Sequence, residues 1–141
     1  MSDIFSALGS ALYARLGTVQ YTYHTNGTAI TTGTLGLYDS MAPQGTVYPY
    51  VVFQYAAGVD TYTFADHGGS HDYVVKVVSN RGHAGQAQEI YGQAHAALQD
   101  APLTVAGGYA LRVRRQAPVK YADSEQYWHV GGIYRIDTWD T

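Results

Sequence analysis

Charged side chains are scarce in this sequence. Only 13% of its 141 residues are charged, against about 25% in an average globular protein. Lys76 and Lys120 are its only lysines, and Glu89 and Glu125 are its only glutamates. Tyrosine, in contrast, occurs 14 times. Because protein–protein interfaces are depleted in Lys and Glu and enriched in Tyr and Arg, this composition predicts a chain that works inside an assembly.

Other absences exclude classes of protein. The sequence has no cysteine, which rules out disulfides and thiol nucleophiles and leaves the redox compartment open. No stretch reaches the roughly 18 apolar residues that a membrane span needs, and Met1–Leu16 lacks the basic start and long apolar run of a secretion signal. The net charge of −3 does not suit a nucleic-acid-binding protein, which is normally basic. We therefore expect no membrane contact and no specific DNA binding.

The hydrophobic pattern predicts one α+β domain over residues 1–141. Apolar residues recur at helical spacing in Ser2–Leu16 and again in Gln86–Gln99. Strands are expected at 18–38 (two strands joined at Asn26-Gly27), Tyr48–Tyr55, Asp72–Ser79, Leu103–Val105, Tyr109–Val119 and Tyr127–Trp139, the last interrupted by Gly131-Gly132. This order predicts an antiparallel β-sheet packed by two helices on one face.

The segment Ala57–Ser70 separates two of the strongest strand signals. Its polar composition predicts a long β-hairpin or loop excursion, a kind of segment that is often functional. It holds a candidate metal pair, His67 and His71, flanked by Asp66 and Asp72. Spacing of four residues suits metal binding on a helix, but the intervening Gly68-Gly69 disfavours a helix, so a solvated loop is the simpler interpretation.

No recognisable catalytic frame is present. The sequence has no Gly-x-Ser-x-Gly turn, no phosphate-binding Gly-rich loop and no dinucleotide fingerprint. We therefore predict that the protein is not an enzyme and has no catalytic residues, no bound metal and no cofactor. A small binding module or metal-dependent hydrolase using His67 and His71 is the alternative of a different class.

A single basic cluster consists of Arg112, Arg114 and Arg115. On a strand, Arg112 and Arg114 share one face and Val113 the other. The arginines could simply form a solvated outer face. Alternatively, their fork-shaped guanidinium groups pair with carboxylates of a neighbouring subunit or touch passing phosphates.

The stretch Leu37–Phe53 resembles a signature of the tail completion proteins of long-tailed bacteriophages, the tail-terminator or tail-to-head joining family. It contains a Tyr-Asp pair, a proline-containing loop and a Pro-Tyr-Val-Val strand. Further similarities follow in order: Val75–Ser79, the helix Gln86–Leu98 with the following Asp100-Ala101-Pro102-Leu103, and His129–Ile136. Two segments depart from the family pattern: Gln20–Thr34 is longer than expected, and Gly131-Gly132 is looser than the usual strand.

The resemblance implies a structural virion protein. Such proteins form a ring, normally a homohexamer, that caps the tail tube, stops its polymerisation and joins the tail to the head connector. Tail tube protein and connector are the implied partners, and DNA crosses the lumen without specific binding. The implied location is the head-proximal end of the virion tail, after assembly in the host cytoplasm. A head-side neck or stopper protein is the nearest alternative.

Two sets of residues are the predicted contacts of this ring. Tyr62, Phe64, Asp66 and His67 are expected to touch a neighbouring subunit or the tube, and the hairpin within 18–34 could do the same. Arg112, Arg114 and Arg115 are expected to face a subunit or the lumen. The Tyr-rich stretches 18–24, 48–55 and 60–64 should become more buried on ring formation.

Overall fold

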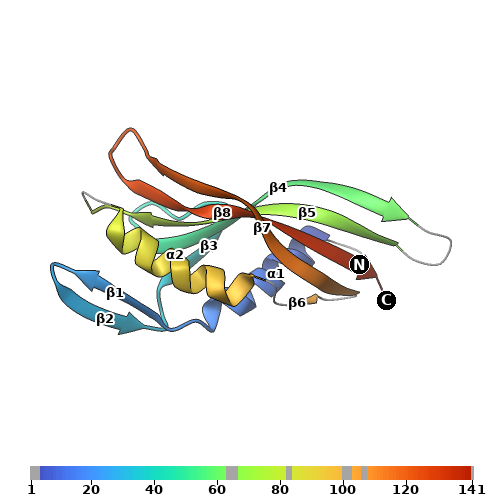
Figure 1. Ribbon diagram of the computed structural model, residues 1–141, viewed down its shortest axis with the longest axis horizontal. Coiled ribbons are helices and arrows are strands. Elements are labelled where there is room, and N and C mark those ends of the chain that lie inside the picture. The colour runs from blue at the N-terminus through green and yellow to red at the C-terminus, as the bar shows by residue number, and fades with distance from the viewer. Residues whose placement is uncertain (1–3, 63–66, 82–83, 100–102, 106–107, 141) are drawn as a thin grey trace.

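The computed structural model describes residues 4–62, 67–81, 84–99, 103–105 and 108–140. In chain order these residues form α1 (Ile4–Gly17), β1 (Tyr21–Thr25), β2 (Thr28–Thr32), β3 (Gly36–Asp39), β4 (Tyr50–Tyr62), β5 (His67–Ser79), α2 (Gly85–Leu98), β6 (Leu103–Val105), β7 (Gly108–Ala122) and β8 (Trp128–Asp140). Figure 1 shows a long twisted sheet with both helices beneath it and the β1–β2 hairpin beside α2.

The main sheet has six strands in the order β3-β4-β5-β8-β7-β6, and β1 and β2 form a separate hairpin. All pairings are antiparallel except β3 with β4, which run parallel. The predicted α+β class is therefore confirmed, with one parallel pair added. Because β8 lies between β5 and β7, the C-terminal strand of the fold is also one of its two central strands.

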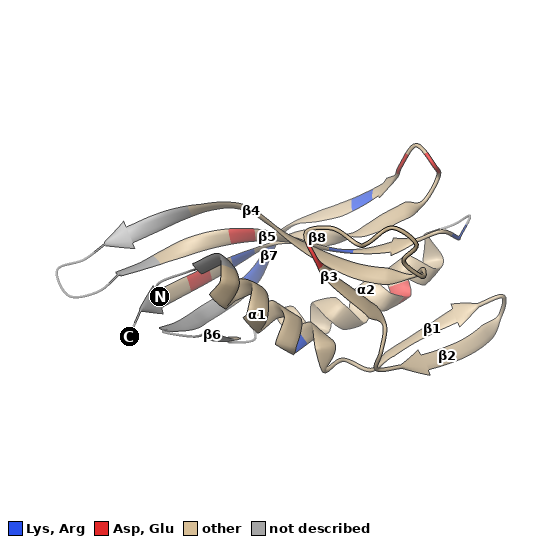
Figure 2. Ribbon diagram, turned by 180° about the vertical axis from the view of Figure 1, so that it is seen from behind, with Lys and Arg blue, Asp and Glu red and all other residues tan. Residues whose placement is uncertain are grey.

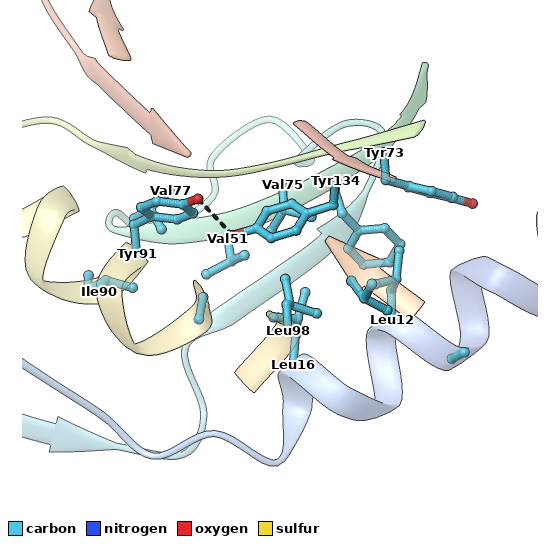
Figure 3. Packing of buried hydrophobic residues seen from close by; sticks show 14 of the residues in the cluster. Leu12, Leu16, Val51, Tyr73, Val75, Val77, Ile90, Tyr91, Leu98 and Tyr134 are labelled. Atoms are coloured by element: carbon cyan, nitrogen blue, oxygen red, sulfur yellow. Dashed lines mark hydrogen bonds between the residues drawn. The ribbon is translucent and has the colours of Figure 1, made fainter. Parts of the chain in front are cut away.

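Both helices pack on one face of this sheet. In α1, Leu8, Leu12 and Leu16 follow each other at spacings of four and are at most 1% exposed, as their helical period requires. The predicted stripe of α2 is also buried, apart from the half-buried Ala97. Beneath the helices lie alternate residues of β4, β5 and β8: Val51, Phe53, Tyr73, Val75, Val77, Val130, Tyr134 and Ile136. Figure 3 shows this single core. The side chains of Ile4 and Phe5, expected on the same face of α1, lie outside the described residues. No described helix has the length and apolar character needed to cross a membrane.

Two strand predictions differ from the structure. The second strand expected within 18–38 is divided into β2 and β3, which belong to different sheets. The excursion Ala57–Ser70, predicted as a long β-hairpin or loop, is a β-hairpin in its described part, so the two strands expected at Tyr48–Tyr55 and Asp72–Ser79 are longer than predicted: β4 continues to Tyr62 and β5 begins at His67. Glycine and polar residues there suppressed the strand signal, and the cross-strand ladder to β5 and β8 overrides that weak local preference.

The predicted interruption at Gly131-Gly132 is wrong. Strand β8 runs through both glycines and pairs with β5 and β7 at each of them. A Cβ atom on Gly131 would lie 2.1 Å from the Val75 carbonyl oxygen, and one on Gly132 would lie 2.6 Å from the Tyr91 hydroxyl oxygen. The glycines are therefore required by close neighbours, which is a common reason for glycine inside a strand.

This requirement predicts opposite effects of alanine at two glycines. Gly131→Ala should lower the free energy of unfolding by about 2–3 kcal/mol, because its methyl group overlaps the β5 backbone. Gly92→Ala, inside α2 with no heavy atom within 4 Å of the new Cβ, should raise that free energy by about 0.5–1 kcal/mol through helix propensity. Urea unfolding of both variants measures the difference, and equal effects would contradict the close approach.

Candidate assembly surfaces

A long β-hairpin, here called the arm, is formed by residues 57–62 of β4 and 67–72 of β5. A β-bulge between Tyr55 and Ala57 marks its base. Of the four contacts predicted on it, Tyr62 and His67 form the last described register pair of the hairpin, with only their backbone described. Phe64 and Asp66 lie outside the described residues. Because bulges increase the local twist and bend a strand, this one re-aims the arm relative to the rest of β4.

Side-chain contacts anchor the arm at this base. The Tyr55 hydroxyl lies 2.9 Å from His71 Nδ1, and a Cβ atom on Gly58 would lie 2.1 Å from the same hydroxyl oxygen. Ser70 donates to Asp137 across the sheet at 2.6 Å, and Arg135 pairs with Asp72 at 3.1 Å. The arm is therefore tied to β8 along its base.

The geometry of β5 does not suit a metal bound by His67 and His71. Both residues lie in one extended strand, so four residues of separation correspond to about 13 Å. His71 is only 4% exposed and contacts Tyr55. Within the described residues there is also no group of three His, Cys, Asp or Glu that could hold a metal ion.

The three arginines of β7 do not form one patch. Arg112 and Arg114 pair in register with Asp137 and Arg135, and the intervening Val113 is buried under the helices. This register places residues 112 and 114 on the opposite face, as the sequence predicts. Arg115 instead lies on the side of α2, where its guanidinium group donates to the Tyr91 hydroxyl at 3.3 Å.

Arg115 extends a polar cluster in the core that the sequence did not reveal. The hydroxyl groups of Tyr91 and Tyr134 lie 2.7 Å apart, and His95 Nδ1 lies 2.6 Å from the Tyr134 hydroxyl. Burial raises the pKa of Tyr134 far above its usual value, and the Tyr91 contact raises it further. The contact between the two tyrosines holds α2 on β8 (Figure 3). The spacing of Tyr91, His95 and Tyr134 does not indicate this contact, because Tyr91 and Tyr134 lie 43 positions apart in the sequence.

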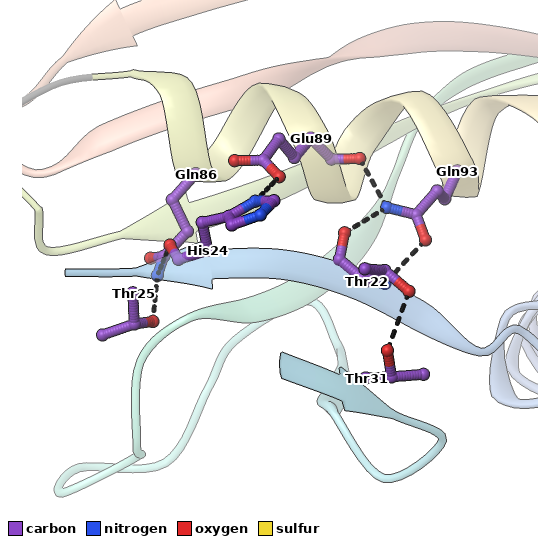
Figure 4. A network of polar contacts seen from close by, with 7 residues as sticks. All are labelled: Thr22, His24, Thr25, Thr31, Gln86, Glu89 and Gln93. Carbon is purple, nitrogen blue, oxygen red and sulfur yellow. Dashed lines mark hydrogen bonds and ion pairs between the residues drawn. The ribbon is translucent and has the colours of Figure 1, made fainter. Parts of the chain in front are cut away.

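The β1–β2 hairpin packs against α2 (Figure 4). The Gln93 side-chain amide accepts from the Thr22 backbone N–H and donates to the Thr22 carbonyl oxygen, both at 2.7 Å. These are the two hydrogen bonds that a neighbouring strand would otherwise make to Thr22. His24 Nδ1 lies 2.8 Å from Glu89 Oε2, and the buried Gln86 donates to Thr25 Oγ1 at 3.0 Å. Burial raises the pKa of Tyr21 to about 12.

Because Tyr21 and Tyr23 are already buried in the single chain, the expected gain of burial in 18–24 cannot come from these two tyrosines. Tyr48, Tyr50 and Tyr55, in β4 or just before it, are only partly buried, so they keep more exposed surface than Tyr21 and Tyr23.

The loop between β3 and β4 exposes two large apolar side chains that the sequence did not single out. Met41 is 79% exposed and Val47 is 82% exposed. The end of this loop is held by aromatic contacts, because the Tyr48 ring lies 5.3 Å from Tyr50 and 5.1 Å from Tyr127. These two exposed apolar side chains make the loop a candidate contact surface.

The turn that joins β7 and β8 is held by Asp123. Its Oδ1 accepts from the backbone N–H groups of Glu125 and Tyr127, and His129 Nε2 donates to its Oδ2 at 2.8 Å. The His129 bond, followed by those backbone bonds, lowers the pKa of Asp123 below 3.8. The His129 ring stacks on Tyr121 with a centroid separation of 4.6 Å, which fixes the hairpin next to Tyr127.

Comparison with known proteins identifies a family and a solved structure with a similar fold. The family model described as "Tail completion protein gp17" matches residues 10–138. A solved chain of the "Virion of native gene transfer agent (GTA) particle" is 17% identical, with a TM-score of 0.77 and coverage of 99% of each chain. At this identity the second match shows a shared fold. No curated protein sequence matches the chain.

The hairpin contacts predict the effect of removing Gln93. Gln93→Ala should accelerate hydrogen exchange of the Thr22 amide and lower the free energy of unfolding by about 1–2 kcal/mol, because two backbone groups lose their partner. Gln88→Ala, at an exposed position of the same helix, is the matched control and should change neither. Equal exchange at Thr22 in both variants would contradict the docking.

The Asp123 contacts predict a pH dependence of stability. Because the pKa of Asp123 is lower in the folded than in the unfolded protein, its ionised form stabilises the fold above the unfolded pKa, and this contribution disappears as the pH falls through the folded pKa. Asp123→Asn should therefore lower the Tm at neutral pH and make little difference at about pH 2. Glu125→Gln, on the same turn, is the control for loss of one charge, and melting curves across this pH range give the comparison.

Proposed function

Because the chain belongs to the tail completion protein gp17 family, we propose that it is a tail terminator. In this proposal it assembles as a ring, normally of six copies, that caps the tail tube, stops tube polymerisation and joins the tail to the head connector. The chain is a structural component of a phage-type tail. The observation that carries the proposal is the extent of the family match, which spans nearly every element of the fold.

The composition and the exposed surfaces support an assembled state. Charged residues make up only 13% of the chain, and Met41 and Val47 are presented to water on an ordered loop. A free monomer gains nothing from that exposure, whereas a subunit in a ring can bury it against a neighbour, the tube or the connector.

The predicted contact residues receive separate roles in this proposal. The arm with Tyr62, Phe64, Asp66 and His67 reaches a neighbouring subunit or the tube. Arg112, Arg114 and Arg115 serve a subunit or lumen contact, with Arg115 held from within by Tyr91. DNA passes the lumen without being gripped, which suits a chain of net charge −3. The ring would occupy the head-proximal end of the tail, after assembly in the host cytoplasm.

The test is assembly of the purified chain with each half of the particle. We expect a ring, detected by native mass measurement alone or with tail tubes, and cosedimentation with tails made without heads. Cosedimentation only with heads made without tails would assign the chain to a head-side stopper instead. A strictly monomeric chain, both alone and mixed with tubes, would contradict the proposal.

In the ring, the exposed apolar loop should be protected. Met41→Asp or Val47→Asp should weaken cosedimentation or ring formation by at least about tenfold, because each places a charge in a buried contact, while the melting temperature of the subunit stays nearly unchanged. Gln54→Asp, at another exposed position, is the control. Unchanged assembly in both loop variants would exclude this loop from the interface.

A further inference from the structure

Each edge of the six-stranded sheet has a stretch with no outer neighbour among the described residues, and the two stretches lie at opposite ends of the sheet. At one edge, β3 pairs only with residues 50–53 of β4. At the other edge, β6 pairs only with residues 108–110 of β7. Among the described residues, Ala57–Tyr62 of β4 and Ala117–Ala122 of β7 therefore each pair with a strand on one side alone. Figure 1 shows the outer half of β4 extending beyond β3.

The two open segments have compatible directions. Residues 57–62 of β4 and 117–122 of β7 are each in register with one inner neighbour, and the open stretch of β7 also includes residues 112–115. The antiparallel pairings β4·β5, β5·β8 and β8·β7 make β4 and β7 run in opposite directions. If a second copy is placed beside the first by rotation about a ring axis, its β4 meets β7 of the first copy antiparallel, which is the more stable pairing.

The charges of the two edges are complementary. Residues 112–122 of β7 contain four basic residues and no acidic one. The opposite edge, formed by β3 and residues 57–62, contains Asp39 and Asp60 and no basic residue. Figure 2 shows basic residues along β7 and acidic residues in the turn that follows it. Opposite charge favours contact between unlike edges and opposes contact between like edges.

Arg114 gives the β7 edge a local surplus of positive charge. It lies directly opposite Arg135, and like charges at such positions repel each other. Arg135 is already paired with Asp72, and no acidic partner of Arg114 exists among the described residues. A carboxylate supplied by another chain would relieve this surplus of positive charge.

The two edges also differ in how far their residues oppose pairing with another strand. Lys and Pro on an exposed edge oppose pairing with other strands, and the β7 segment has both: Lys120, and Pro118, which has no N–H to donate, so a partner strand can form only part of the ladder there. The β4 segment has neither residue type. An unprotected edge of six residues is a ready template for another strand, so a specific partner is needed to cover it.

We propose that copies of this chain join edge to edge, with the open segment of β7 (Ala117–Ala122) of one subunit adding antiparallel to the open segment of β4 (Ala57–Tyr62) of the next. The contact is head-to-tail, so it closes into a ring when the rotation between copies closes. The diagonal offset of the open segments supplies the stagger that a closed sheet requires. This inference rests on the ring of the proposed function and names the surfaces that build it.

The absence of cysteine makes a crosslinking test clean. Val59 and Val119 pair with Ser70 and Gly131, positions on the sheet face away from the helices. A chain with Val59→Cys and Val119→Cys, treated with a mild oxidant, should give a ladder of crosslinked subunits up to the full ring. The matched control, Gln88→Cys with Val119→Cys, has the same number of thiols, with one on the exposed side of α2, and should give no ladder.

A charge exchange gives a second readout that needs no crosslink. Lys120→Glu alone and Asp60→Lys alone should each weaken subunit association by about tenfold, and the double variant should recover most of it. Glu125→Lys, in the β7–β8 turn, changes one charge away from both edges and should leave association unchanged. Melting temperatures of all variants confirm that the subunits are folded.

The outcomes separate the two proposals. Rings that form without crosslinking between residues 59 and 119 above the control, and without recovery in the double variant, overturn the edge contact and leave the ring standing. A chain that forms no oligomer, alone or with tubes, overturns both.

Discussion

The packing of α2 on β8 is the contact on which the rest of the structure depends. Tyr91 reaches the sheet where Gly132 leaves room for its hydroxyl group, and there it contacts Tyr134 and Arg115. This one contact joins the helix layer to the central strand and to the edge strand β7. The same helix carries Gln86 and Gln93, which hold the β1–β2 hairpin. If α2 were displaced, the core, the hairpin and the orientation of Arg115 would all change together.

The sequence predicts the parts of the fold that depend on local periodicity. Leu8, Leu12 and Leu16 at helical spacing and the alternating valines of Asp72–Ser79 lie where the pattern places them. The errors occur where distant residues decide the structure. Gly131 and Gly132 look like strand breakers, but close contacts from β5 and α2 keep them in the strand. The sequence leaves the arm open between a β-hairpin and a loop, because its ladder partners on β8 lie almost 70 residues away.

The candidate surfaces could be predicted only in part, for the same reason. The alternation of Arg112, Val113 and Arg114 follows from a period of two. The same alternation places Arg115 on the face of Val113, but its contact with Tyr91 depends on the packing of α2, which the strand pattern does not indicate. The exposure of Met41 and Val47 could not be predicted from the sequence either, because a single apolar residue in a loop can be buried or exposed. The low content of charged residues indicates that the chain works in an assembly, whereas the open edges of the sheet indicate how one subunit could recognise the next.

The central place of β8 has a consequence for the biosynthesis of the subunit. Every other strand of the main sheet precedes it in the chain, yet β5 and β7 meet only through it. While β8 is still inside the ribosome, the β4–β5 hairpin and β7 have no common sheet, and contacts between residues so distant in sequence form slowly. The complete sheet, with both of its edges, therefore forms only after β8 has been added between β5 and β7.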